Sequence, residues 1–208
     1  MKGRRNDYVA HEGIPFLLSC LALAAVGWRL GGLPWIVPPA LLFVLLATVF
    51  RDPDRVIPAA PLGVVSPVDG IVTEIGVSDC GVVDGEVHRI LIAISAFGSY
   101  SARSPVEGKI MDLHCDLPQH ARSAEPRGLW VRTDENEDVV LQFHGYRCGM
   151  APRALQRFGE RIGQGQRCAW LRLARVAEVQ LPLPARVLVQ AGQRVRAGTD
   201  LLAKLPHH

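Results

Sequence analysis

The sequence predicts a mainly β protein, with a transmembrane helical hairpin at the N-terminus followed by a β-sandwich or barrel domain. Residues 14–50 carry a single charged side chain, Arg29, whereas most other charges lie in residues 51–208. In that second part, short runs of β-branched and apolar residues alternate with Gly and Pro, which is typical of closely spaced strands. We therefore expect a membrane-anchoring hairpin over residues 1–50 and a β domain over residues 51–208.

The overall composition argues against several classes of function. The net charge of +3 on 208 residues gives no reason to expect a nucleic-acid partner. The five cysteines are odd in number, have no CxxC spacing, and include Cys20 inside the apolar segment, which argues against a disulfide framework or a structural zinc site. No histidine pair has the spacing of a metal site, so we expect none. Cys148 and Cys168 would be nucleophiles only with a base beside them.

Two apolar runs form the expected hairpin, Ile14–Trp28 and Leu33–Phe50, joined by the turn Arg29-Leu30-Gly31-Gly32. Each is at or just below the roughly 17–25 residues that a membrane-spanning helix needs. Trp28 and Trp35 would serve as anchors at a membrane interface. A cleaved signal peptide is an alternative, but it leaves the second apolar run unexplained.

Basic residues flank the hairpin unequally. Three precede the first apolar run and two follow the second, whereas only Arg29 lies in the turn; the flanking residues are Lys2, Arg4, Arg5, Arg51 and Arg55. By the positive-inside rule, both ends of the hairpin then face the cytoplasm. A hairpin buried in a soluble core is disfavoured, because Pro34, Pro38 and Pro39 would interrupt such helices.

The β domain is expected to contain short strands separated by turn residues, as in a sandwich or barrel. The candidate strands are 63–65, 70–75, 88–94, 108–111, 129–132, 139–143, 168–173, 177–181 and 186–189. The segments Pro67–Val72 and Gly192–Gly198 are similar to the P-x-D-G-x-V and G-x-x-V-x-x-G turns of biotinyl and lipoyl carrier domains. Tight glycine turns of this kind favour a flattened barrel with lipoyl-like features.

One short amphipathic helix is predicted over residues 151–162, with Pro152 near its start and Gly163 just past its end. At helical spacing, Leu155, Phe158 and Ile162 fall on one face, and Arg153, Arg157 and Arg161 fall on another. Beside an anionic membrane, such a basic face would bind phospholipid. The alternative is an ordinary solvated face.

The most informative motif is Phe50-Arg51-Asp52-Pro53-Asp54-Arg55-Val56-Ile57-Pro58, followed by Ser66-Pro67-Val68-Asp69-Gly70. It resembles the FFRDP-x-R-x-x-P and SPADG motifs of the short, membrane-anchored phosphatidylserine decarboxylases. The resemblance implies a protein of phospholipid (phosphatidylethanolamine) biosynthesis at a bacterial-type inner membrane, with its β domain facing the cytoplasm. It also implies a carboxy-lyase activity that depends on a pyruvoyl group made from the chain itself.

The position of the pyruvoyl group departs from the family pattern. In the family motif I-R-F-G-S-R-V-D-V, the serine attacks the preceding glycine carbonyl, and elimination then cleaves the chain. The matching residues here are Leu171-Arg172-Leu173-Ala174-Arg175, which place Ala174 at the glycine and Arg175 at the serine. No serine follows Ser123, and arginine offers no β-leaving group. We therefore expect no pyruvoyl cofactor.

The family's proton relay is also incomplete. The family segment D-V-H-x-x-R-x-P corresponds to residues 98–105, where Tyr100 stands at the histidine and Gly98 at the aspartate. Of the Asp-His-Ser triad, only Asp69 is retained. Arg103 keeps the family's arginine, and we expect it to bind lipid together with the basic residues of the predicted helix.

Three hypotheses follow from this pattern. The first is a degenerate family member that binds phospholipid or a partner without decarboxylation, in association with an anionic membrane and with a homo-oligomer or an active paralogue as its protein partner. The second is an active decarboxylase with atypical processing. The third is a lipoyl- or biotinyl-like carrier or adaptor, although neither Lys109 nor Lys204 has the sequence context of a modified lysine.

Overall fold

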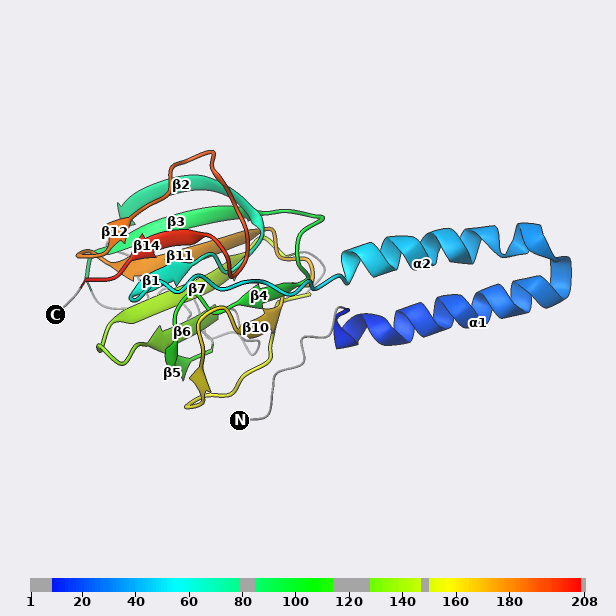
Figure 1. Cartoon of the computed structure of the whole chain (residues 1–208), viewed down its shortest axis with the longest axis horizontal. Helices are drawn as coiled ribbons and strands as arrows, with labels where there is room; N and C mark the ends of the chain where they lie inside the picture. The colour runs from blue at the N-terminus through cyan, green and yellow to red at the C-terminus, as the bar shows by residue number, and fades with distance from the viewer. Residues whose placement is uncertain (1–8, 79–84, 114–127, 147–149, 207–208) are drawn as a thin grey trace. The chain divides into compact units, whose positions relative to one another are not determined.

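The computed structural model describes residues 9–78, 85–113, 128–146 and 150–206. The chain divides into two compact units. The first unit contains Met1–Asp54 together with Ala96–Tyr100, and the second contains Arg55–Ser95 together with Ser101–His208. The first unit is helical, and the second consists of β-strands (Figure 1).

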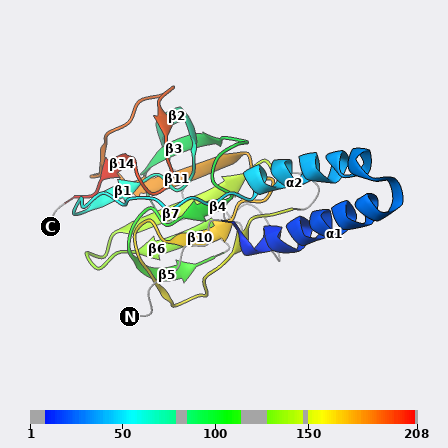
Figure 2. The ribbon, with the colours of Figure 1, turned by 45° about the vertical axis from the view of Figure 1, so that its right-hand side comes forward.

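The first unit is a hairpin of two helices that run side by side in both ribbon views (Figure 1, Figure 2). A 3-10 turn, η1 (His11–Gly13), leads into α1 (Ile14–Gly31), and a second turn, η2 (Leu33–Trp35), leads into α2 (Val37–Val49). The prolines that would interrupt a helix lie in the first turns of α1, η2 and α2, where the missing N–H would have no helical partner.

The open end of the hairpin is closed by the backbone. Val9 and Arg51 form an isolated antiparallel bridge, and the Ala10 N–H donates to the Phe50 carbonyl at 2.9 Å. At the other end, Gly32 adopts a positive φ of 71°, and its N–H donates to the Trp28 carbonyl. The two helices predicted from the apolar runs are therefore confirmed as helices.

The hairpin surface is apolar on nearly all sides. Within the described residues, the helix over His11–Gly31 is the one long and apolar enough to cross a membrane, and Leu33–Val49 is a shorter apolar helix. Many large apolar side chains of both helices are exposed, among them Phe16, Trp28, Trp35 and Val44. A helix that is apolar all round requires an apolar environment.

The second unit contains short antiparallel strands, and its mainly β class confirms the prediction (Figure 2). The strands are β1 (Gly63–Val65), β2 (Gly70–Ser78), β3 (Val87–Ile94), β4 (Ser101–Arg103), β5 (Gly108–Asp112), β6 (Gly128–Arg132), β7 (Asp138–His144), β8 (Arg153–Ala154), β9 (Arg161–Ile162), β10 (Arg167–Trp170), β11 (Val176–Pro182), β12 (Arg186–Val187), β13 (Arg194–Val195) and β14 (Leu201–Lys204). All nine candidate strands predicted from the sequence coincide with one of these.

The strands form three sheets. The largest has the order β13-β2-β3-β11-β7-β6-β5-β9, and two three-stranded sheets have the orders β1-β14-β12 and β4-β10-β8. Among the described residues the large sheet has two ends, β13 and β9, so the sheets do not close into a barrel. The unit is therefore an assembly of open sheets.

Strand β11 shows how the core is built. Its side chains alternate across the sheet, so Ala177, Val179 and Leu181 lie in the hydrophobic core. Val179 pairs with Ile90 of β3 and with Leu141 of β7, both fully buried. Fully burying one such side chain contributes about 1.5–3 kcal/mol. The alternate residues of β11 point to the opposite face, where the site described below includes a buried carboxylate.

The helix predicted over residues 151–162 is wrong. That segment forms β8, a turn and β9, and its backbone groups bond to neighbouring strands: Leu155 N–H donates to the Cys168 carbonyl, and Gly159 N–H donates to the Ile110 carbonyl. Gly159 adopts a positive φ of 80°, which no α-helix accommodates. Apolar residues at helical spacing are a weak signal over so short a segment, and pairing with β5 and β10 outweighs it.

Candidate functional site

Arg175, at the position predicted to have lost the serine, lies at the start of β11 with its backbone fixed on both sides. Its N–H donates to the His144 carbonyl at 3.1 Å, and its carbonyl accepts from the Ile94 N–H at 2.8 Å. The preceding turn is closed by the Ala174 N–H, which donates to the Leu171 carbonyl at 3.0 Å. The Arg175 side chain is exposed. The backbone N–H and carbonyl of Arg175 are thus held by two neighbouring strands, β7 and β3.

That turn contains a strained residue. Arg172 has a φ of 51°, in the left-handed region that non-glycine residues rarely adopt, and its guanidinium lies 3.4 Å from the Ala151 carbonyl. Ala174 is buried, with 9% of its surface exposed. The turn places Arg175 in the sheet, and the left-handed conformation of Arg172 destabilises it by about 1 kcal/mol.

Asp69, the retained member of the relay, is engaged by structural partners. Its carboxylate accepts from the Arg55 guanidinium at 2.7 Å and from the Ala197 N–H at 2.8 Å. Its own carbonyl accepts from the Ser95 N–H at 2.8 Å. Both oxygens of the Asp69 side chain therefore stabilise the fold, which gives this residue a structural role.

The second unit brings the positions of Asp69 and Arg175 to the same end of β3. Ile94 donates its N–H to Arg175, and the next residue, Ser95, donates to Asp69. Gly70 pairs with Ile94 on one side of β3, and Val176 pairs with Ala93 on the other. Two residues separated by more than a hundred positions are thus placed around the end of one strand.

Tyr100 belongs to the first unit. Its hydroxyl donates to the Glu12 carboxylate at 3.1 Å, its ring centroid lies 4.8 Å from that of Phe50, and its N–H donates to the Arg51 carbonyl at 3.1 Å. The adjacent Ser99 hydroxyl donates to the fully buried Asp52 at 2.9 Å. Tyr100 therefore links its segment to the residues at the open end of the hairpin. Because its hydroxyl donates to a carboxylate, it does not act as a base in this arrangement.

The four arginines predicted to bind lipid have different surroundings. Arg103 is buried, with 2% of its surface exposed, and donates to the Gly165 carbonyl at 3.0 Å, which does not fit the lipid-binding role predicted for it. Arg161 is exposed and bound by both carboxylate oxygens of Asp134, at 2.6 and 2.8 Å, and this hydrogen bonding raises the pKa of Arg161. Arg153 and Arg157 are exposed. Because the predicted helix is absent, the last three do not share a helical face.

The cysteine and histidine expectations are tested in part. Cys168 is buried, and burial raises the pKa of its thiol to about 12, so it does not supply a thiolate at neutral pH. Cys148 lies outside the described residues. Within the described ranges there is no group of three or more His, Cys, Asp or Glu side chains placed to hold a metal ion. Lys109 and Lys204 both lie within strands, β5 and β14, and not at a hairpin tip.

Sequence reasoning missed a buried polar cluster on β11 and its two neighbours. Glu178, with 4% of its surface exposed, lies 2.9 Å from the His144 Nε2 and 3.0 Å from the Arg89 guanidinium. The Gln180 amide donates to Glu178 at 2.9 Å and to Gln142 at 3.2 Å. The alternation in Val176–Pro182 puts Glu178 and Gln180 on one face, but their partners on β3 and β7 become apparent only from the strand register.

The cluster keeps Glu178 ionised. Burial alone would raise the pKa of Glu178, but hydrogen bonds from His144 and Gln180 and the charge of Arg89 outweigh burial and lower it. An ionised carboxylate can only accept, so His144 Nε2 carries the hydrogen in this bond.

We expect Glu178→Gln to lower the free energy of unfolding by about 1.5–3 kcal/mol at neutral pH, because it removes a charged hydrogen-bond acceptor. A lowered folded-state pKa contributes stability above the unfolded value, near pH 4.3, and that stability is lost as the pH falls through the folded value. The variant should therefore lose less stability than the wild type below about pH 4.3. Urea unfolding followed by tryptophan fluorescence at several pH values measures both effects.

The matched control is Glu74→Gln, an exposed glutamate on β2. This change should leave both the stability and its pH dependence nearly unaltered, because an exposed carboxylate contributes little. Equal behaviour of the two variants would show that the cluster does not stabilise the charge of Glu178.

Comparisons with known proteins bear on this site. The family model described as phosphatidylserine decarboxylase matches residues 42–203. The phosphatidylserine decarboxylase proenzyme of Nitrosomonas europaea is 31% identical over 210 residues, covering 96% of each chain. That of Aromatoleum aromaticum is 32% identical over 216 residues, covering 97% of this chain and 99% of its own. Among solved structures, the glucose permease IIA from Mycoplasma capricolum superposes with a TM-score of 0.46 at 18% identity, covering 68% of this chain and 94% of its own.

Proposed function

The chain belongs to the phosphatidylserine decarboxylase family, and on that premise we propose that it is a membrane-anchored member that does not form a pyruvoyl group. It acts in phospholipid metabolism by binding phospholipid or a protein partner without decarboxylation. The observation that carries this proposal is Arg175 at the serine position, in a part of the chain whose hydroxyl side chains after Ser123 are limited to Thr133, Tyr146 and Thr199.

The residues present do not fit the prosthetic group of the family. A pyruvoyl group arises from a serine whose hydroxyl becomes a leaving group, and an arginine side chain has none. Arg175 also has both backbone groups in the ladder between β3 and β7, and the carboxylate of Asp69 is bound by Arg55 and Ala197. We therefore assign no reaction step to this position.

The test is the mass of the purified full chain on a denaturing gel and by mass spectrometry. We expect a single intact chain of 22.7 kDa. An active decarboxylase with atypical processing is the second candidate, favoured by the printed description of the relatives as proenzymes. Two fragments, one with a carbonyl at its new N-terminus, together with release of carbon dioxide from phosphatidylserine, would establish that candidate.

Anchoring in the membrane is a further part of the proposal. The apolar hairpin supports it, and the excess of basic residues at its two ends over its turn supports a cytoplasmic position for the second unit at the inner membrane. Digestion of sphaeroplasts with an external protease should then leave the second unit intact. Degradation of the second unit in intact sphaeroplasts would show that it lies on the opposite side of the membrane.

The exposed arginines support binding to anionic lipid through β8 and the loop between β8 and β9. Arg153 and Arg157 are exposed there, together with Phe158, whose exposed fraction is 71%. Each Arg near an anionic leaflet contributes roughly 1 kcal/mol, whereas Arg161 already binds Asp134. We place the attraction in Arg153 and Arg157 because both side chains are exposed.

We expect the fragment from Arg51 onward to bind vesicles that contain anionic lipid and to be released by high salt, as screening requires. The double change Arg153→Gln and Arg157→Gln should weaken sedimentation with these vesicles by roughly tenfold or more, from about 1 kcal/mol per Arg. The matched control, Arg161→Gln, should change binding little, and circular dichroism should confirm that all fragments are folded. Equal binding to neutral vesicles would leave these arginines as solvated surface residues.

We propose that the protein partner is either a second copy of this chain, in a homo-oligomer, or an active paralogue. The chain aligns with the relative from Nitrosomonas europaea over 96% of its length at 31% identity, and this similarity supports an assembly with a second copy or with a related chain. Chemical cross-linking in membranes, followed by mass spectrometry, would identify the partner as a second copy or a paralogue. Exclusively monomeric chains would argue against both.

A further inference from the structure

The segment Ala96–Tyr100 joins β3 to β4 along the chain, yet it packs in the helical unit. Its contacts involve residues that flank both helices at the open end of the hairpin. Tyr100 bonds to Glu12, just before α1, and to Arg51, just after α2, and its ring packs on Phe50. Ser99 adds a hydrogen bond to Asp52. The segment is therefore fixed to the open end of the hairpin.

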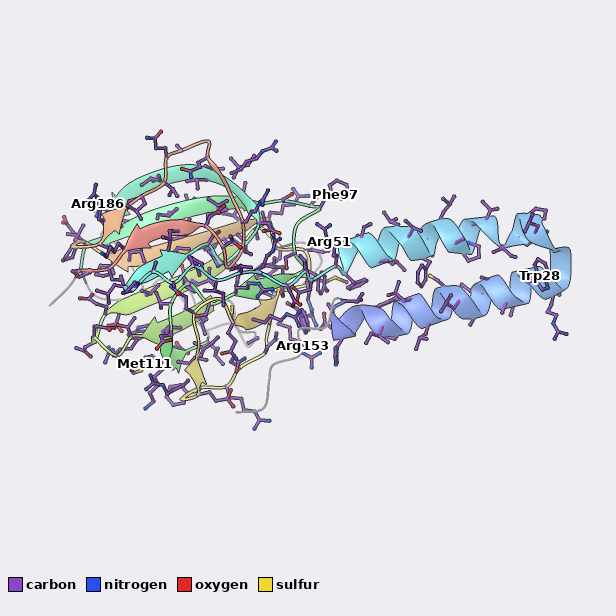
Figure 3. The ribbon with its side chains drawn as sticks, in the orientation of Figure 1. Trp28, Arg51, Phe97, Met111, Arg153 and Arg186 are labelled. Carbon is purple, nitrogen blue, oxygen red and sulfur yellow. The ribbon has the colours of Figure 1, made fainter. Side chains whose placement is uncertain are left out.

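The hairpin has the length that places this end at a membrane surface. The helix over His11–Gly31 has 21 residues, which at about 1.5 Å per residue span about 30 Å, the thickness of the hydrocarbon core. Trp28 lies at the turn, and Arg51 lies at the opposite end (Figure 3). With the turn at one interface, Arg51 and the segment bound to it lie at the other.

Phe97 is the exposed apolar residue of this segment. Its exposed fraction is 74%, and Figure 3 shows it toward the same end of the hairpin as Arg51. An exposed Phe side chain at the depth where a spanning helix ends is suited to insertion at the boundary between the headgroups and the acyl chains.

We propose that the segment Ala96–Tyr100 is a third membrane-contacting element, with Phe97 inserted at the headgroup level of the bilayer. The proposal rests on the membrane anchoring proposed above. It makes the connection between β3 and β4 a lipid-facing loop, held in place by Tyr100 and Ser99 and contacting lipid through Phe97. The occupant of this surface is the phospholipid bilayer itself.

The test introduces the photoreactive residue p-benzoyl-phenylalanine into the full chain at one position at a time, in native membranes. Phe16 of α1, 55% exposed, reports on the hairpin, Phe97 reports on the segment, and Val77 of β2, 56% exposed, is the control in the second unit. After irradiation, the mass of the chain is measured. We expect a mass increase of one phospholipid at positions 16 and 97 and none at position 77.

The outcomes separate the two proposals. Lipid adducts at position 16 but not at position 97 would overturn the inference about the segment and leave the hairpin anchored. No lipid adduct at position 16 would overturn the anchoring itself. A protein adduct at position 97 would show that a partner chain or a second copy covers Phe97, and would equally overturn the inference. All three positions are exposed, so each variant should fold.

Discussion

Replacing Gly70 with alanine is expected to destabilise the second unit by at least about 3 kcal/mol. The new methyl group would have no room, because the atoms that it meets belong mainly to the backbone of the neighbouring strand and cannot rotate away. A Cβ at Gly70 would overlap the carbonyl oxygen of Ala93 and lie 2.8 Å from a methyl group of Ile92. Gly70 pairs with Ile94 on β3 and with Val195 on β13, so neither neighbouring strand can move away without losing its pairing.

Gly76 provides the matched control, since it lies in the same strand, β2, with nothing within 4 Å of an added Cβ. Gly76→Ala should be neutral or stabilise the protein by about 0.5 kcal/mol, because glycine weakens a strand interior. Urea unfolding of both variants, followed by the fluorescence of Trp130 and Trp170, measures the difference. Equal stability of the two variants would mean that the close approach of β2 to β3 at Gly70 is not as tight as the structure has it.

The second large effect concerns self-cleavage. Arg175→Ser alone, or with Ala174→Gly, is expected to leave the chain uncut, because the serine would have a hydroxyl but no base to take its proton. Tyr100, at the position of the family's histidine, donates its hydroxyl to Glu12. The triple change Tyr100→His, Ala174→Gly and Arg175→Ser is the smallest that should produce fragments, since it supplies the base, the small residue and the leaving group together.

The readout is a denaturing gel combined with a hydrazide probe for a carbonyl at the new N-terminus. The control is the triple variant with Arg175→Ala, which has the histidine but no hydroxyl and should stay intact. Cleavage of the single serine variant would show that the proton relay is not what this chain has lost. An uncut triple variant would show that Asp69, bound by Arg55 and Ala197, is not available to orient a histidine.

Much of the fold could be predicted from the sequence because its signals are local. The nearly uncharged run over residues 14–50 indicated the two helices, and Gly and Pro between apolar runs located nine of the strands. The helix predicted over residues 151–162 failed for the same reason. Leu155, Phe158 and Ile162 are spaced as on a helix, but two-residue strands fixed by distant partners leave no periodic signal of their own.

The candidate site was only half predictable. The family motifs located Asp69, Tyr100 and Arg175, but nothing in them indicated that Tyr100 would bond to Glu12, 88 residues earlier in the chain. The burial of Arg103 was missed because its partner is a backbone carbonyl, that of Gly165, which has no sequence signature. The cluster around Glu178 depends on the register of three strands, and register is a property of the assembled sheet.

The closed base of the hairpin has a mechanical consequence. Because Ala10 bonds to Phe50 and Val9 pairs with Arg51, the two helices are held together independently of the loop that connects them. A protease site inserted between Gly31 and Gly32 could then be cut without separating the pieces, so that the nicked protein would still migrate as one particle in mild detergent. The loop at Gly31 and Gly32 only connects the two helices, whereas the hydrogen bonds at the open end hold them together.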